Sequence, residues 1–405
     1  MSASSPTVAY LFTTFPKVSE TFLQREVRAM LAQGVDVRLF SLWGGGGTFA
    51  GVPVATFSKW RLLELLGIIP WAAVVHPRVF WRLVAGVLTR RSGSALTLLE
   101  NFLGAGFAGV HYRGFRRAGV QWIHAVWGGG PATAAWILHR LNGHPYSVGV
   151  HAYDLYQDGG DPWLPEKVAA ARFVHTSTAM AATELQRRGL GRGKVLVIRR
   201  GLDAFPALRP LRDRREPLRI LCVARLVEKK GLLRQVAVYR HLKGQSFSFT
   251  VRIVGEGPLR AALERKIDEE GLRGRVQLLG QLPSHEVWRQ LEWADVLVHT
   301  GVVAASGDRD GLPNVIPEAM SAGVLVVTTP EAGPQEAVTE GRSGFVAPLD
   351  EPARWEAALR RIVTDDALAE AVRREARRWT EENYDARRNA AVLAAAFRSG
   401  GRQEP

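Results

Sequence analysis

Two cations follow a predicted buried strand in the second half of the chain. The strand is expected over Leu218 to Ala224, and Arg225 and Lys230 come just after it, in the run RLVEKKG. A guanidinium offers a planar fork of donors and an ammonium a mobile point charge, so together they suit the two phosphates of a diphosphate. A pair of solvated surface cations would give the same pattern, and position alone leaves that alternative open.

Two carboxylates lie eight positions apart in the stretch GDRDGLPNVIPEAMSAG, at Asp310 and Glu318. Pro317 predicts a first helical turn, Asn314 is a plausible N-cap, and Gly323 is expected to close the helix. Carboxylates accept hydrogen bonds from sugar and ribose hydroxyls, and the amides at a helix start attract phosphate or sugar oxygens. The backbone amides near Gly311 to Val315 are expected to face the ligand, and Gly311, Leu312, Pro313 and Asn314 are the candidate donor-binding residues of this segment. Taken singly, each carboxylate is more often a solvated charge.

Two further patterns in this half are weaker. Gly255 and Gly257, in VGEGPLR, leave a predicted strand, and glycine there lets a ligand approach the main chain or serves packing alone. The triplet Asp308-Arg309-Asp310 resembles an acidic metal-binding triplet known from another fold, but it precedes the amide-rich turn. We assign it no metal and expect no cofactor beyond the co-substrate.

The first half supplies a histidine at the end of a predicted strand. His151 follows Tyr146 to Val150, and a neutral imidazole there could bind a sugar or a leaving phosphate. A core histidine bonded to a neighbouring carbonyl would look the same. The weaker acceptor-side candidates flank predicted strands and helices: Lys17, Ser19, Glu20, Thr21, Gly128, Gly129 and Asp154.

Short apolar runs alternate with helical patterns along the whole chain, which predicts parallel sheets covered by helices on both faces. A proline- and charge-rich stretch after Asp203 is typical of a linker. We therefore expect an α/β protein of two doubly wound domains, at 1–205 and 206–384, with a helix over 385–405. Ligands of such sheets bind beyond the carboxyl ends of the strands, so a cleft between two facing sheets is expected to hold the site.

Composition fits a globular protein of a reducing compartment. The 405 residues are 46% hydrophobic and include one cysteine, Cys222, which excludes an internal disulfide and a cysteine-rich zinc site. The first residues lack the pattern of a signal peptide, so we expect a cytoplasmic protein.

The net charge of +14 is concentrated in the first half, where residues 1–205 hold 22 Lys and Arg against 11 Asp and Glu. Residues 57–120 combine 9 basic and 2 acidic side chains with several tryptophans, a mixture that suits an anionic membrane surface. The apolar run from Leu62 to Val75 is too short to span a bilayer. A buried helical hairpin is an equal alternative, and nucleic-acid binding ranks last because no known motif accompanies the charge.

Taken together, five motifs resemble the family-four retaining glycosyltransferases of GT-B fold, especially the bacterial exopolysaccharide branch of colanic-acid type. The motifs span nearly the whole chain: FPKVSETF, HAYD, RLVEKKG, VGEGPLR and DGLPNVIPEAMSAG.

The resemblance implies roles for individual residues. Glu318 would hold the ribose, Asp310 and the following amides the donor sugar, and Arg225 with Lys230 the diphosphate. Leu282 falls where the family's main chain meets the nucleobase. The last helix is expected to cross back onto the N-terminal domain, and the implied reaction is metal-independent sugar transfer with retained anomeric configuration.

The sequence departs from the family pattern at three positions. The first acidic residue is Asp310 rather than the commoner Glu, Val126 replaces a frequent histidine, and Arg200 replaces an Asn. These changes put the identity of the sugar in doubt. The expected partners are a nucleotide-sugar donor and a glycan or lipid-linked acceptor, with no nucleic acid; an epimerase, a phosphorylase or a non-catalytic donor-binding scaffold are the alternatives.

Overall fold

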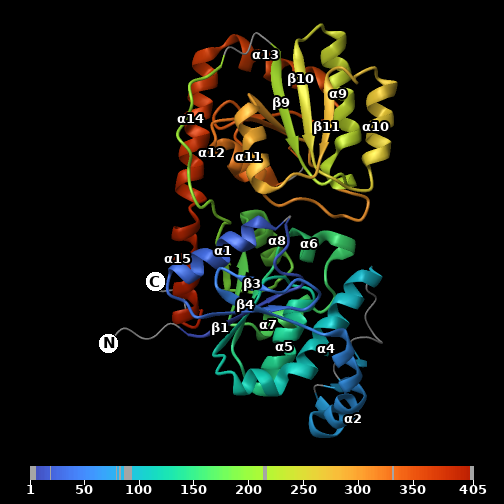
Figure 1. The fold of residues 1–405 in the computed structure, drawn as a ribbon, viewed down its shortest axis with the longest axis vertical. Helices are drawn as coiled ribbons and strands as arrows, with labels where there is room; N and C mark the ends of the chain where they lie inside the picture. The colour runs from blue at the N-terminus through green and yellow to red at the C-terminus, as the bar shows by residue number, and fades with distance from the viewer. Residues whose placement is uncertain are drawn as a thin grey trace. The chain divides into compact units, whose positions relative to one another are not determined.

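The structure, a computed structural model, describes residues 6–401 except 19, 79, 82–83, 86–93, 213–216 and 331–332. The chain forms two compact units, residues 1–201 with 386–405 and residues 202–385. Each unit has its own parallel sheet between layers of helices (Figure 1), so the predicted pair of doubly wound α/β domains is confirmed.

Unit 1 is built on an eight-stranded sheet of order β3-β4-β2-β1-β5-β6-β7-β8, parallel except for the β3–β4 pair. Its strands are β1 (Val8–Phe12), β2 (Val37–Ser41), β3 (Thr48–Phe49), β4 (Val52–Thr56), β5 (Trp122–Ala125), β6 (Tyr146–Gly149), β7 (Phe173–Thr176) and β8 (Val195–Val197). Its α-helices are α1 (Thr21–Ala32), α2 (Leu65–Val75), α4 (Ala95–Arg117), α5 (Gly130–Asn142), α6 (Ala152–Tyr156), α7 (Leu164–Ala170), α8 (Ala179–Arg187) and α15 (Ala386–Arg398). Two short 3-10 helices are η1 (Lys59–Glu64) and η2 (Gln157–Gly159).

Strand β1 divides the core of unit 1 into two layers because its side chains alternate between the two faces of the sheet. Tyr10 packs in a cluster with α1 and α15, whereas Ala9 and Leu11 pack in a second cluster with α4 and α5. The aromatic ring of Phe397, on α15, lies 5.9 Å from that of Trp122. The last helix is therefore part of the core of unit 1.

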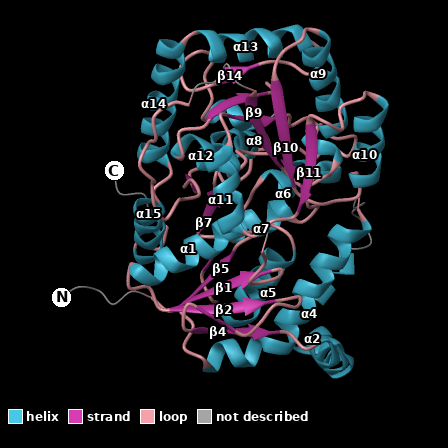
Figure 2. Cartoon of the chain, turned by 45° about the horizontal axis from the view of Figure 1, so that its top comes forward, coloured by secondary structure: helices cyan, strands magenta, loops and turns pink. Residues whose placement is uncertain are grey.

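Unit 2 has a six-stranded, fully parallel sheet of order β11-β10-β9-β12-β13-β14. Counted from its first strand, this order is 3-2-1-4-5-6, that of dinucleotide-binding folds. Its strands are β9 (Leu218–Val223), β10 (Phe249–Val254), β11 (Val276–Gly280), β12 (Val296–His299), β13 (Leu325–Thr328) and β14 (Phe345–Val346). Its helices are α9 (Leu232–Gly244), α10 (Arg260–Glu269), α11 (Ser284–Trp293), α12 (Val315–Ser321), α13 (Pro352–Thr364) and α14 (Asp366–Asn383), with η3 (Glu228–Lys230) and η4 (Gly333–Glu336). Figure 2 shows helices on both faces of the sheet.

The boundaries of the units differ slightly from the predicted 205 and 384. The N–H of Leu202 donates to the carbonyl of Tyr384 at 2.7 Å, and both side chains are buried in the core of unit 2. The stretch expected to be a linker packs along α14, where Arg377 donates to the carbonyl of Pro206. Arginine donors on α14 therefore tie this stretch to unit 2.

Segment 57–120 is only partly buried. None of the residues of α2 is buried, whereas α4 packs one face into the core through residues such as Leu103 and Phe107. The alternative of a buried helical hairpin therefore holds for one face of α4 but not for α2, whose Leu65 and Ile68 are only partly buried against the core. Within the described residues, no helix combines the length and the apolar character that crossing a bilayer requires.

Candidate functional site

The loop after β9 brings two lysines to the carboxyl edge of the sheet of unit 2. Gly231 ends this loop with φ of +62°, and a Cβ there would lie 2.2 Å from the carbonyl oxygen of Thr300. The hydroxyl of Thr300 in turn donates to the carbonyl of Lys230 at 2.8 Å. Only glycine fits this position, so the backbone fixes Lys229 and Lys230 against the end of β12.

Asp310 is the centre of a buried charge cluster. Its carboxylate forms an ion pair with the ammonium of Lys230, and Nζ of Lys229 lies 3.6 Å away. Burial alone would raise the pKa of Asp310, but Lys230 and His299 outweigh it and hold that pKa well below its usual range. Asp310 is therefore a permanent anion, suited to accepting hydrogen bonds and unsuited to donating a proton.

His299, the last residue of β12, is the site residue that sequence reasoning missed. Its Nε2 lies 3.3 Å from a carboxylate oxygen of Asp310, while its Nδ1 accepts from the backbone N–H of Gly301. Burial lowers the pKa of His299 despite the favourable carboxylate. The neutral ring thus carries its proton on Nε2 and donates it to Asp310. In the sequence, the signal that could have identified His299 is its position at the end of a predicted strand, where such sheets bind ligands.

Glu318 is buried in the first turn of α12. Pro317 occupies that turn and Gly323 follows the helix with φ of +75°, as predicted. Asn314 stands at the N-cap position, but its side chain makes no capping hydrogen bond and its backbone is helical. The prediction that the Asn314 side chain caps the helix is therefore wrong. Before the helix, Gly311 packs against Gly333. The predicted amide segment also includes Leu312, which is buried, and Pro313.

Arg225 contrasts with Lys230. Arg225 is exposed, and its guanidinium has no partner among the residues that the structure describes. It is therefore available to an anion, whereas Lys230 is already neutralised by Asp310.

The two glycines of VGEGPLR serve the packing of this edge. A Cβ on Gly255 would lie 1.9 Å from the carbonyl oxygen of Ala224, and one on Gly257 2.5 Å from that of Leu226. The structure thus supplies the packing reason for both glycines, by holding the loop after β10 against the loop of Arg225. Leu282 is partly buried and packs against the core cluster that contains Val315 and Ile316 of α12.

In unit 1, His151 is buried at the end of β6. Its Nε2 accepts a hydrogen bond from the guanidinium of Arg200 at 2.8 Å, and its Nδ1 lies 3.3 Å from Oγ of Ser177. Burial, reinforced by Arg200, lowers the pKa of His151 well below its usual value. The ring is therefore neutral, and its acceptor nitrogen is engaged by the arginine that departs from the family pattern.

Asp154 lies beside His151 and accepts from its backbone N–H at 2.9 Å. Burial raises the pKa of Asp154 to about 7. A Cβ on Gly128 would approach this side chain within 3.0 Å, so the glycine run lies directly against Asp154.

Three of the weaker acceptor-side candidates, Lys17, Glu20 and Thr21, lie at or just before the start of α1. Lys17 and Glu20 form an ion pair of 2.9 Å, and Thr21 begins the helix. Ser19 lies outside the described residues. The ion pair is largely exposed on its lysine side and contributes little to stability.

Lys167 is a second residue that sequence reasoning missed. It binds the loop that contains Gly128 and Gly129, here called the glycine loop. Its fully buried ammonium donates to Asp161 at 2.9 Å and to the carbonyl oxygens of Gly128 and Gly129 at 2.9 and 3.2 Å. No sequence signal distinguishes a buried lysine in LPEKVAA from a surface one. Its ion pair satisfies the charge, and its remaining donors fix the loop.

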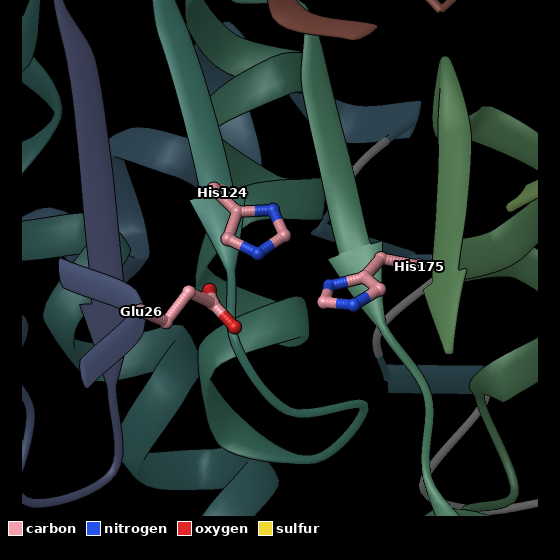
Figure 3. Close-up of side chains that lie close together, drawn as sticks. All are labelled: Glu26, His124 and His175. Carbon is pink, nitrogen blue, oxygen red and sulfur yellow. The ribbon is translucent and has the colours of Figure 1, made fainter. Parts of the chain in front are cut away.

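Three possible metal ligands meet inside unit 1, from α1, β5 and β7. Figure 3 shows the carboxylate of Glu26 and the imidazoles of His124 and His175 turned toward one another, with one donor atom of each within 4.8 Å of the others. Burial lowers the pKa of both histidines. Glu26, however, already balances the guanidinium of Arg200 at 2.9 Å. A divalent ion at this site would place a second cation beside the carboxylate of Glu26. We therefore assign no metal to these three residues.

Comparison of the sequence with known proteins identifies a family. Residues 208–379 match the model of the family described as glycosyl transferases group 1. The chain is 30% identical over 397 residues to the putative colanic acid biosynthesis glycosyltransferase WcaL of Escherichia coli K12, covering 93% of this chain and 96% of that protein. It is 37% identical over 175 residues to the amylovoran biosynthesis glycosyltransferase AmsK of Erwinia amylovora, covering 43% of each chain.

Solved structures share the fold at low sequence identity. The structure of Anabaena HepE in complex with UDP and glucose superposes with a TM-score of 0.72 at 16% identity, covering 97% of this chain and 100% of that one. Sucrose-phosphate synthase of Thermosynechococcus elongatus gives a TM-score of 0.73 at 17% identity, covering 97% and 98%. The chain therefore belongs to the group 1 glycosyl transferases and has the GT-B fold.

Proposed function

We propose that this glycosyltransferase moves a sugar from a nucleoside-diphosphate sugar to a hydroxyl of a glycan or lipid-linked acceptor in cell-surface polysaccharide synthesis. The observation that carries the proposal is the cluster at the sheet edge of unit 2. There buried Asp310 and His299 lie with part-buried Lys230, and exposed Arg225 has no partner among the described residues. The likeness to WcaL and AmsK supports a role in exopolysaccharide synthesis. HepE, solved with UDP and glucose, supports the class of donor.

The proposed reaction proceeds without a metal and with retention at the anomeric carbon. The bond from the anomeric carbon to the β-phosphate oxygen breaks, a bond to the acceptor oxygen forms on the same face, and the acceptor proton passes to the departing phosphate. Arg225 stabilises the charge that develops on the diphosphate, joined by Lys230. Asp310, a fixed anion, accepts from sugar hydroxyls, and Glu318 from the ribose. Leu282 lies beside the base, and neutral His151 orients the sugar.

We place the reaction at the cytoplasmic face of a membrane. The support is the described part of segment 57–120, whose exposed side chains include apolar Trp60, Leu66 and Val74 and basic Arg78 and Arg113. Flotation with vesicles containing an anionic lipid tests this placement, because electrostatic attachment weakens at high salt. Failure to float at low salt would refute it.

The transferase proposal is tested by thermal-shift screening of nucleotide sugars, followed by product analysis with the stabilising donor. The expected result is acceptor-dependent release of nucleoside diphosphate and a product of retained anomeric configuration by NMR. If the donor isomerises without an acceptor, the protein is an epimerase instead. If consumption of the donor requires free phosphate, it is a phosphorylase. If the donor binds without turnover, it is a non-catalytic scaffold. Added chelator is expected to leave the rate unchanged.

A further inference from the structure

The outer helix α2 of unit 1 is apolar on all sides and yet has no buried residue. Its sequence is LLGIIPWAAVV, and Leu66, Val74 and Val75 are at least half exposed. Figures 1 and 2 both show α2 beside α4 at the margin of unit 1, and α4 adds exposed Leu96, Leu99 and Phe102. Soluble proteins rarely expose a contiguous apolar surface of this kind without a partner.

A pocket of about 410 Å³ opens among α2, α4 and α5. Its volume lies in the range of small-molecule sites, about 300–1,000 Å³. The lining is almost wholly apolar and includes Ile68, Trp71, Phe80, Phe102, Ile137 and Trp163. A hollow lined in this way suits a hydrocarbon chain and offers little to a sugar or a nucleotide.

The few polar side chains of the lining connect the pocket to the glycine loop. Asn101 and Thr133 both line it. The hydroxyl of Thr133 lies 3.3 Å from the carbonyl oxygen of Gly129, and Asn101 accepts from Lys167, which also binds that loop. Trp136 and Trp163 also line the pocket. Their indole N–H groups are buried and have no partner among the described residues. One wall of the pocket is thus continuous with the support of the proposed acceptor loop.

Cations stand at the surface around this pocket. The guanidinium of Arg113 lies 5.9 Å from the ring of Trp71 and 5.4 Å from that of Tyr112, two of the lining residues. Arg113 is exposed, although its Nε also donates to the hydroxyl of Tyr112 at 2.6 Å, whereas Arg61 is paired with Glu64 at 2.7 Å. An apolar hollow with an exposed arginine at its border is complementary to a hydrocarbon chain that carries an anionic head.

We infer that this pocket binds the hydrocarbon chain of the acceptor, a phosphate-bearing lipid. Identifying the lipid as the acceptor rests on the proposed function; the binding of a chain rests on the pocket alone. The exposed residues of α2 and α4 then lie in the membrane surface from which the lipid enters.

Binding of isoprenyl phosphates to the full chain tests the inference, with tryptophan fluorescence as the readout because Trp71, Trp136 and Trp163 line the pocket. Farnesyl phosphate is expected to bind, geranyl phosphate several-fold more weakly, and inorganic phosphate not measurably. The informative variant is Ala72→Phe, which fills the pocket; the control is Ala73→Phe, because Ala73 is its neighbour on α2 and does not line the pocket. Ala72→Phe is expected to weaken farnesyl phosphate binding at least tenfold, and Ala73→Phe less than twofold.

Three further readouts separate the possible causes of failure. Thermal unfolding of both variants checks their fold, and donor-induced thermal shifts report on unit 2, so they test the proposed function independently. Vesicle flotation is expected to persist in Ala72→Phe, because the exposed residues remain. Equal binding of all three phosphates, no binding at all, or equal effects of the two variants would overturn the inference. So would a concentration-dependent dimer that covers α2 and excludes farnesyl phosphate.

Discussion

The behaviour of single residues depends on which charges already have partners. Lys230 is neutralised by Asp310, whereas the guanidinium of Arg225 has no partner in the described part of the chain. Both were proposed from the same sequence pattern. The pattern could place them at a sheet edge, but it could not reveal that one of them is held by a carboxylate eighty residues away.

We predict that Arg225→Ala lowers kcat/KM for the donor by about 100-fold, equivalent to about 2.7 kcal/mol of lost transition-state stabilisation. The loss follows because the exposed guanidinium of Arg225, which has no partner among the described residues, can meet the charge of the leaving diphosphate. The matched control is Arg234→Ala, which removes another exposed guanidinium from the following helix, α9. Steady-state kinetics with the donor measure both. Equal rates in the two variants would remove Arg225 from the site.

Asp154 gives a prediction about stability and pH. Its pKa is raised to about 7 in the folded protein by burial, against an ordinary value of 3.8. Between these values the folded state holds a proton that the unfolded state has lost, so the contribution of Asp154 to the stability of the wild type falls as pH rises from about 4 to about 7. Asp154→Asn removes this dependence and should gain about 3 kcal/mol relative to wild type between pH 4.5 and 7.5.

Urea unfolding at several pH values measures the effect of Asp154→Asn. The difference from wild type is the quantity to follow, because the buried histidines titrate in both proteins. Asp36→Asn is the control, since the side chain of Asp36 is 50% exposed. A difference that stays flat with pH would show that Asp154 is ionised in the fold.

At the scale of elements, the sheet edge of unit 2 depends on contacts between backbones. Gly255→Ala is predicted to destabilise the protein by more than 2 kcal/mol, because its Cβ would lie 1.9 Å from the carbonyl oxygen of Ala224 at φ of +145°. Gly274→Ala is the control, since its Cβ would meet nothing within 4 Å. Denaturant unfolding compares them, and similar stabilities would contradict the packing account.

The alternation of apolar and helical runs predicts both parallel sheets, but it does not predict β3, β4 or β14. Strands β3 and β14 are only two residues long, and β4 contains Pro53, which has no N–H for the ladder. The sequence also predicted the turn of Pro317 and Gly323, since both residues restrict the backbone locally. His299 and Lys167 were missed because their roles arise from partners distant in sequence, Asp310 and Asp161. Local patterns report backbone preference; they do not report which charges meet.

At the scale of the molecule, the chain builds two separate cores and returns its last helix to the first. Phe397 on α15 is buried among Tyr10, Trp122 and Phe173 of unit 1. We predict that Phe397→Ala destabilises unit 1 by about 3–5 kcal/mol, the usual effect of removing a buried phenylalanine, while unit 2 is unaffected. Hydrogen exchange followed peptide by peptide measures this. Faster exchange in the strands of both units would show that they unfold as one.

The central claim is that the carboxyl edge of the sheet of unit 2 holds a nucleoside-diphosphate sugar. Hydrogen exchange with and without the stabilising donor tests it most directly, because exchange reports where a ligand protects the backbone. The account predicts protection at 225–231, 255–257 and 310–318, reduced in Arg225→Ala at the same donor concentration. Protection confined to other segments, with these three unchanged, would contradict it.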